Sequence, residues 1–128
     1  MKRFTVEEAE ALIPELERIF AAIGELAAQA EAKAASLQRR DEESDAVAAA
    51  IDRSQLQFLA RGIQERLQEI SALGAVPKGV EPALVDFPAR LAGRDVYLCW
   101  KLGERAIAHY HGVEDGFAGR KPLPRRKP

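Results

Sequence analysis

The spacing of apolar residues changes once along this chain, and that change limits the folds open to it. In residues 1–74 apolar side chains recur at alternating intervals of four and three, which is typical of helices packed side by side. In residues 84–112 they recur at every second position, which is typical of strands with one buried face. The sequence therefore predicts an α+β protein, in which a long antiparallel helical hairpin packs on a small three-stranded antiparallel β-meander.

The first predicted helix begins at a capping box. Thr5 and Glu8 are spaced so that each side chain can bond the backbone N–H of the other residue. Pro14 lies inside the helix and predicts a kink, because proline lacks the N–H that a helical hydrogen bond needs. The apolar seam comprises Leu12, Leu16, Ile19, Ile23, Leu26 and Ala30.

The second predicted helix follows the polar residues 38–44, which form the connector. Ser44 or Asp45 is its predicted N-cap, and Gly74 is its predicted stop. Its seam comprises Ile51, Leu56, Leu59, Ile63, Leu67, Ile70 and Leu73. The other sides of both helices are rich in Ala, which permits close approach in the manner of a coiled coil, so we expect a homodimer through the helices.

The strands are predicted to follow a linker that contains Pro77, Gly79 and Pro82. Gly93-Arg94 and Gly103-Glu104 have Gly at the first central position, the pattern of two-residue type II′ turns. These turns place Phe87 opposite Trp100, Leu98 opposite His109 and Val96 opposite His111. In that register Trp100 and both histidines face the helices, and Cys99 lies on the opposite face. A Cys–His zinc site within one hairpin is therefore not expected, unless the turn is one residue longer.

His109 and His111 are the strongest candidates for a metal site. Residues two apart on a strand point the same way, so the two imidazoles could chelate one divalent ion such as zinc. Glu104 and Glu114 are nearby acids that could complete the ligand set. The pattern alone favours structural histidines over a metal pair, because the chain lacks a Cys-x-x-Cys or His-Glu-x-x-His pattern.

Three further residues are candidates for function. Cys99 could be a nucleophile if Lys101, on the same face, lowered its pKa; the alternative is a small packed side chain. Trp100 is most simply a core anchor. Arg120 follows a glycine-rich loop, residues 112–119, and could pair with Glu114, with Asp115 or with helix carboxylates.

Composition limits the class of protein. The chain has 128 residues, 47% of them hydrophobic and 30% charged, which indicates one globular domain over residues 1–123 with a basic tail at 124–128. The net charge of −1 gives no general attraction to nucleic acid or membranes. A single Cys, and a basic start with no apolar segment behind it, favour the cytoplasm.

Four segments resemble a bacterial family catalogued as domain of unknown function 2203. They are FTVEEA at 4–9, LVDFPA at 84–89, VYLCWKLGE at 96–104 and GFAGRKPL at 116–123. The resemblance spans nearly the whole chain but implies no activity. The third strand of that family resembles Tyr-Trp-His, so by this match His111 is the family's histidine and His109 is a departure.

Together these observations favour a small cytoplasmic binding or interaction module with a divalent-metal site near the third strand. The first alternative is a metal-dependent or acid–base enzyme that uses His111 with Glu104 or Glu114. The second is a protein that associates with nucleic acid through its basic tail, by the attraction of Lys and Arg to phosphate.

Overall fold

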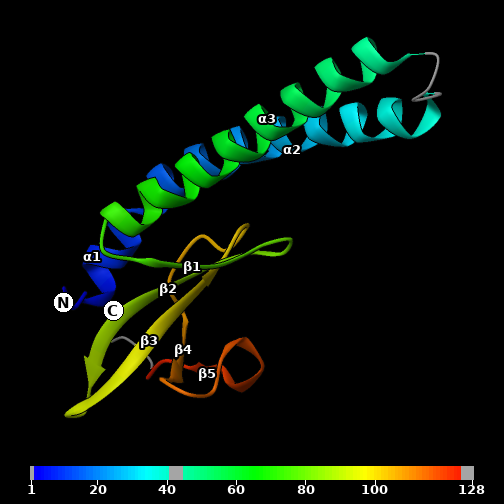
Figure 1. The fold of residues 1–128 in the computed structure, drawn as a ribbon. Helices are drawn as coiled ribbons and strands as arrows, with labels where there is room; N and C mark the ends of the chain where they lie inside the picture. Colours follow the sequence, from blue (N-terminus) through cyan, green and yellow to red (C-terminus); the bar gives the residue numbers. More distant parts are fainter. Residues whose placement is uncertain (1, 41–44, 125–128) are drawn as a thin grey trace. The chain divides into compact units, whose positions relative to one another are not determined.

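The computed structural model describes residues 2–40 and 45–124. Its internal contacts fall into two compact units (Figure 1). The sheet unit comprises Met1–Arg18 and Ile70–Pro128, and the hairpin unit comprises Ile19–Glu69. The α+β class and the two long helices are as predicted, whereas the sheet has five strands rather than three.

The helical region begins as its sequence predicts. Helix α1, Val6–Ala11, follows the complete capping box: Thr5 accepts from Glu8 N at 3.1 Å, and Glu8 accepts from Thr5 N at 2.9 Å. The kink predicted at Pro14 is a break, because α1 ends at Ala11, with Leu12 as its C-cap, and α2 then runs over Ile13–Arg39. Pro14 thus occupies the first turn of α2, where a missing N–H costs no helical bond.

Helix α3, Ala46–Ala72, returns antiparallel to α2 (Figure 1). At its start the Asp45 carbonyl accepts from Ala49 N at 2.8 Å, while Ser44 lies outside the described residues. Gly74 stops the helix with φ +95°, as predicted for a C′ glycine. Three large apolar side chains of α3 are exposed, Val47, Ile51 and Phe58. The homodimer through the helices stays a prediction.

The hairpin unit also contains a buried carboxylate that sequence periodicity did not reveal. Asp52 of α3 is only 4% exposed and accepts from Arg40 Nε of α2 at 2.6 Å. Lys33 Nζ lies 3.8 Å away, and the Ser36 hydroxyl donates at 3.4 Å. The hydrogen bond from Arg40 lowers the pKa of Asp52; burial opposes this, and the charges of Arg40 and Lys33 reinforce it. Asp52 therefore links the two helices electrostatically.

Asp52 should make the stability of the chain depend on acid pH. Its pKa is lower in the folded state, so the unfolded chain takes up the proton first as the pH falls. The stabilisation is present above the unfolded pKa of about 3.9 and is lost as the pH drops below it. Asp52→Asn should lower stability at pH 7 and reduce its fall between about pH 5 and pH 3. Urea unfolding followed by far-UV circular dichroism measures both effects.

The matched control is Glu31→Gln, which removes an exposed acid from α2. This variant should retain both the neutral stability and the acid dependence of the original chain. An acid dependence that is identical in Asp52→Asn and the original chain would show that Asp52 does not contribute.

The sheet is antiparallel throughout, in the order β1-β2-β3-β4-β5. Its strands are β1 Val76–Val80, β2 Ala83–Leu91, β3 Arg94–Lys101, β4 His109–Gly112 and β5 Lys121–Pro122. The predicted meander is its middle, β2 to β4. The segment that was predicted to be a linker forms β1 instead. An edge strand tolerates Pro77, and a shift in the pairing register between Pro77 and Gly79 accommodates the glycine.

The first hairpin differs from the predicted register by two residues. Its turn is Ala92-Gly93, with φ +52° and +79°, so that Leu91 pairs with Arg94 and Phe87 pairs with Leu98. Positive φ at both central residues is the requirement of a type I′ turn, which matches the twist of the strands. A shift of two residues keeps every side chain on its predicted face.

The predicted register of the second hairpin is wrong by one residue, which reverses the faces. Residues 102–108 form a longer connection than the predicted turn, and Tyr97 pairs with His111 and Cys99 with His109. This connection is held by Trp100 Nε1, which donates to the Glu104 carbonyl at 2.9 Å, and by Ile107 N, which donates to Glu10 of α1. Both histidines therefore lie on the face of Cys99.

The other face of the sheet carries the apolar core of the sheet unit. Its buried side chains are Val85, Phe87, Ala89, Val96, Leu98 and Trp100, as the alternation predicted. Phe87 packs edge-on against Phe4, with ring centroids 5.1 Å apart. The Phe4 N–H also donates to the Pro88 carbonyl at 2.7 Å, which ties the start of the chain to β2. The role predicted for Trp100, a core anchor, is confirmed.

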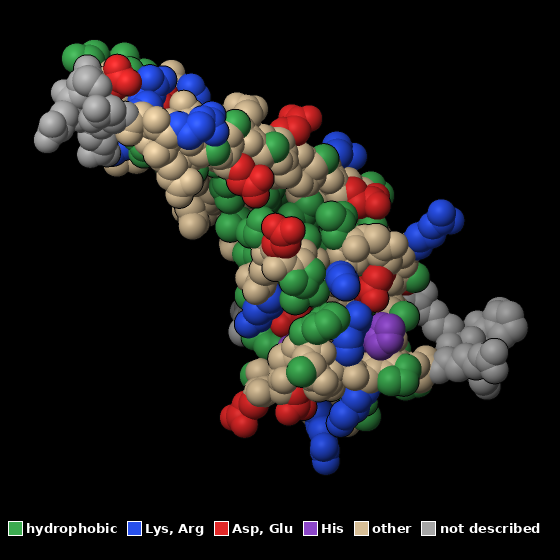
Figure 2. Space-filling model, turned by 90° about the vertical axis from the view of Figure 1, so that its right-hand side faces the viewer, with side chains coloured by type: hydrophobic (Ala, Val, Ile, Leu, Met, Phe, Trp, Pro, Cys, Tyr) green, Lys and Arg blue, Asp and Glu red, His purple; other side chains and the backbone are tan. Residues whose placement is uncertain are grey.

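Charged side chains of both signs are interspersed on the face of the molecule shown in Figure 2. Over residues 2–40 and 45–124, no helix combines the length and apolar character that crossing a bilayer requires.

Candidate metal centre

Asp86, Cys99 and His111 converge on the face of the sheet opposite the apolar core. Each comes from a different strand: Asp86 of β2 pairs directly with Cys99 of β3, and His111 of β4 pairs with Tyr97, two residues from Cys99. A carboxylate oxygen, the thiol sulfur and an imidazole nitrogen all lie within 4.8 Å of one another. The corrected register of β4 is what brings His111 to this position.

The three side chains are almost fully buried. Asp86 is 3% exposed, Cys99 1% and His111 2%. The His111 Nε2 atom lies 3.0 Å from Asp86 Oδ2, and its Nδ1 atom lies 2.8 Å from the Gly112 carbonyl oxygen. Both ring nitrogens of His111 therefore have a protein oxygen within hydrogen-bonding distance.

These contacts determine the tautomer of the imidazole. A carbonyl oxygen can only accept, so the Nδ1 atom of His111 carries a proton and donates to Gly112. In the neutral ring, Nε2 then has a lone pair directed at Asp86 Oδ2, which is also an acceptor. Two acceptors 3.0 Å apart need either one proton between them, carried by His111 or by Asp86, or a metal ion beside them.

Cys99 completes the group as a protonated thiol when no metal is bound. Burial raises the pKa of Cys99 to about 11, the charges of Asp86 and Glu104 add to this, and Arg120 opposes it. This argues against the reactive nucleophile considered from the sequence, because the thiolate is the reactive form. A metal ion would displace the proton and bind the thiolate.

A pocket of about 400 Å³ opens onto these three residues. Its remaining walls come from β1, from the start of β2 and from the loop after β4. The residues that line it in addition to the three are Lys78, Leu84, Val113, Glu114, Gly116 and Phe117. Molecules that enter this pocket could thus contact an ion held by Asp86, Cys99 and His111.

Glu104, His109 and Arg120 form a second cluster beside the buried group, and Arg120 Nη2 also donates to the Cys99 carbonyl at 3.3 Å. Glu104 accepts from Arg120 Nη2 at 3.0 Å and from Lys101 N at 2.8 Å, whereas His109 Nδ1 is 3.9 Å from its carboxylate. Burial alone would raise the pKa of Glu104, but these hydrogen bonds and the charge of Arg120 lower it. Arg120 pairs with Glu104 rather than with the acids considered from the sequence.

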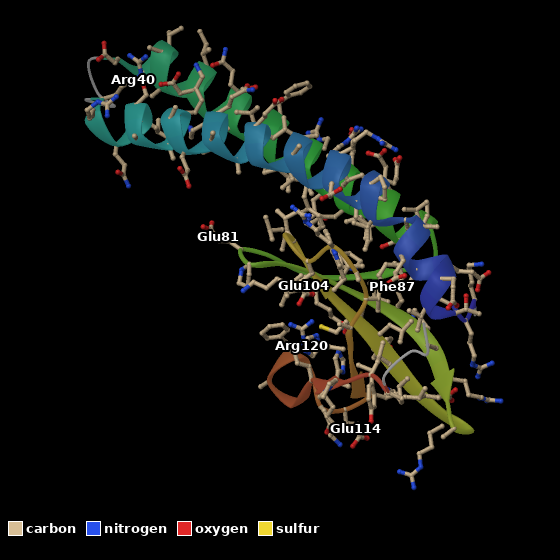
Figure 3. The ribbon with its side chains drawn as sticks, turned by 180° about the vertical axis from the view of Figure 1, so that it is seen from behind. Arg40, Glu81, Phe87, Glu104, Glu114 and Arg120 are labelled. Atoms are coloured by element: carbon tan, nitrogen blue, oxygen red, sulfur yellow. The ribbon has the colours of Figure 1, made fainter. Side chains whose placement is uncertain are left out.

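The predicted metal ligands are thus divided between two places. His111 belongs to the buried group, and Glu114 lines the pocket beside it. Glu104 and His109 belong to the Arg120 cluster. Figure 3 shows Glu104 and Arg120 near each other, with Glu114 on the C-terminal loop.

Asp86 was not among the predicted site residues, although the sequence held a signal for it. It lies between Val85 and Phe87 in a stretch, residues 83–89, that is otherwise apolar, and by alternation it shares the face of Cys99. A buried carboxylate needs a partner to offset its desolvation, so an acid in such a strand predicts a polar cluster. The predicted register of β4 pointed the histidines away from it.

The fold and this group define an α+β protein with a buried Asp–Cys–His cluster beneath a pocket. The chain belongs to the family described as "Uncharacterized conserved protein (DUF2203)", whose model matches residues 2–123. No curated protein and no solved structure matches the chain.

Proposed function

We propose that this protein is a small metal-binding module that holds one divalent ion through Asp86, Cys99 and His111, with zinc the favoured ion. The observation that carries the proposal is the orientation of His111. Its Nδ1 proton is engaged by the Gly112 carbonyl, and its Nε2 atom faces a buried carboxylate beside a buried thiol. Histidines that bind metals commonly donate their second ring N–H to a backbone carbonyl in this way.

The chemistry of the donor set supports zinc. Thiolate, imidazole and carboxylate are its usual protein ligands, and together they select it over magnesium or calcium, which prefer oxygen alone. Tetrahedral zinc holds its ligand atoms about 3–4 Å apart. The donor atoms here lie within 4.8 Å of one another, so small side-chain movements would close the site. Three protein ligands would leave a fourth position open toward the pocket.

Catalytic zinc sites also have an open fourth position. The same arrangement is therefore compatible with the alternative function, a metal-dependent enzyme. In that alternative Glu114 is better placed than Glu104, because Glu114 lines the pocket and Glu104 pairs with Arg120. The nucleic-acid alternative rests on the basic tail, of which residues 125–128 lie outside the described part of the chain.

The metal content of the purified protein tests the proposal. The full chain should be purified without an affinity tag, stripped with a chelator and reloaded with zinc under reducing conditions. We expect stoichiometric zinc by mass spectrometry, together with a rise in the midpoint of thermal unfolding, because an ion that binds only the folded state stabilises it. The proposal would be contradicted if the chain took up no zinc and if zinc did not change its thermal unfolding. That result would indicate a proton between His111 and Asp86 in place of a metal ion.

A further inference from the structure

The open coordination position of the proposed metal site faces a pocket whose walls indicate what could bind there. This inference rests on the proposed function, because the ligand is expected to contact the metal ion. The pocket has a volume of about 400 Å³, which suits a small molecule. The three proposed metal ligands line this pocket together with one basic, one acidic and several apolar side chains.

One wall contributes a positive charge. Lys78 of β1 lines the pocket, and its Nζ atom lies 5.5 Å from the centroid of the Tyr97 ring. The Tyr97 ring in turn lies 5.6 Å from the His111 ring, and Lys78 and His111 line the same pocket. Within the described part of the chain, Lys78 forms no ion pair with a carboxylate. Its charge is therefore available to an anion in the pocket.

Much of the remaining lining is apolar. Leu84, Val113 and Phe117 line the pocket, and Val113 and Phe117 are 55% and 38% exposed. Burying such exposed side chains against an apolar group is favourable. Glu114 is exposed beside them, and its negative charge would oppose anions, most strongly those of high charge.

We propose that the pocket binds a small organic carboxylate with a short apolar body. A carboxylate oxygen would occupy the open position of the metal, Lys78 would balance the negative charge, and the apolar body would lie against Leu84, Val113 and Phe117. A single negative charge suits a site in which Cys99 and Asp86 neutralise a divalent ion. Inorganic phosphate, which carries more charge and no apolar group, should bind less well.

Cobalt in place of zinc provides the readout, because the visible absorption of Co²⁺ changes when its ligands change. The Co²⁺-loaded full chain should be titrated with butyrate, acetate and inorganic phosphate. We expect butyrate to bind about tenfold more tightly than acetate, from the burial of two additional methylene groups. Lys78→Gln should weaken butyrate binding at least about threefold, and Glu114→Gln should strengthen it, because the two changes remove opposite charges.

The outcomes separate this inference from the proposal on which it rests. A normal Co²⁺ spectrum that no carboxylate alters would overturn the inference and leave the metal site intact. Failure to bind Co²⁺ at all would overturn both. Tighter binding of phosphate than of butyrate, or unchanged butyrate binding in Lys78→Gln, would overturn the assignment of a carboxylate ligand.

Discussion

Replacing Cys99 with Ser is expected to weaken Co²⁺ and Zn²⁺ binding at least about 100-fold, because changes even to the residues that support metal ligands cost about 10–100-fold. Cys99 supplies the only thiolate of the proposed site, and a serine hydroxyl is a far weaker ligand at neutral pH. His111→Gln should have an effect of similar size. Competition with a chromophoric chelator measures the affinity of each variant.

His109→Gln is the matched control for His111→Gln. Both residues lie on β4, but His109 is near Glu104 and outside the buried group. Its replacement should leave the metal affinity within about threefold of the original, which is less than 1 kcal/mol. Equal losses in the two histidine variants would instead support the chelate of His109 and His111 that strand alternation suggested, and would contradict the site proposed here.

Phe87→Ala is expected to lower the free energy of unfolding by about 3–5 kcal/mol, the usual cost of removing a buried aromatic ring. The Phe87 side chain is fully buried and packs edge-on against Phe4, which joins β2 to the segment before α1. The cavity left behind would separate these elements. Urea unfolding at neutral pH, monitored by Trp100 fluorescence, measures the change.

Phe117→Ala is the control for this variant, because it makes the same substitution at a side chain that is 38% exposed. Its ring contacts the guanidinium of Arg120 at 4.7 Å, a contact worth about 0.5–1 kcal/mol at an exposed site. The loss should therefore stay near 1 kcal/mol. A loss in Phe87→Ala no larger than in Phe117→Ala would show that Phe87 does not anchor the core of the sheet unit.

The helices and the apolar face of the sheet were predictable because each depends on local pattern. The capping box at Thr5 and the stop at Gly74 are short-range features whose geometry follows from the residues themselves. Alternation likewise placed Phe87 and Trp100 in the core. This placement is correct even though the turn of the first hairpin was predicted wrongly, because a register shift of two residues leaves each side chain on the same face.

The site was less predictable because it depends on the length of one connection. Residues 102–108 look like a tight turn at Gly103, but Trp100 Nε1 and Glu10 bind the backbone of this segment and hold a longer loop. Glu10 is remote in sequence, so local pattern carries no sign of its contact. The resulting shift of one residue places His111 on the face of Asp86 and Cys99. The ion pair of Arg120 with Glu104 is likewise a contact between residues far apart in the sequence, which local pattern does not predict.

The X-ray absorption spectrum of the zinc-loaded protein at the zinc K edge tests the central claim most directly, because it reports the atoms bound to the metal. We expect one sulfur neighbour at about 2.3 Å and nitrogen or oxygen neighbours at about 2.0–2.2 Å. The sulfur neighbour should be absent in Cys99→Ser. A spectrum of the original chain with nitrogen and oxygen neighbours only would contradict a site built from Asp86, Cys99 and His111.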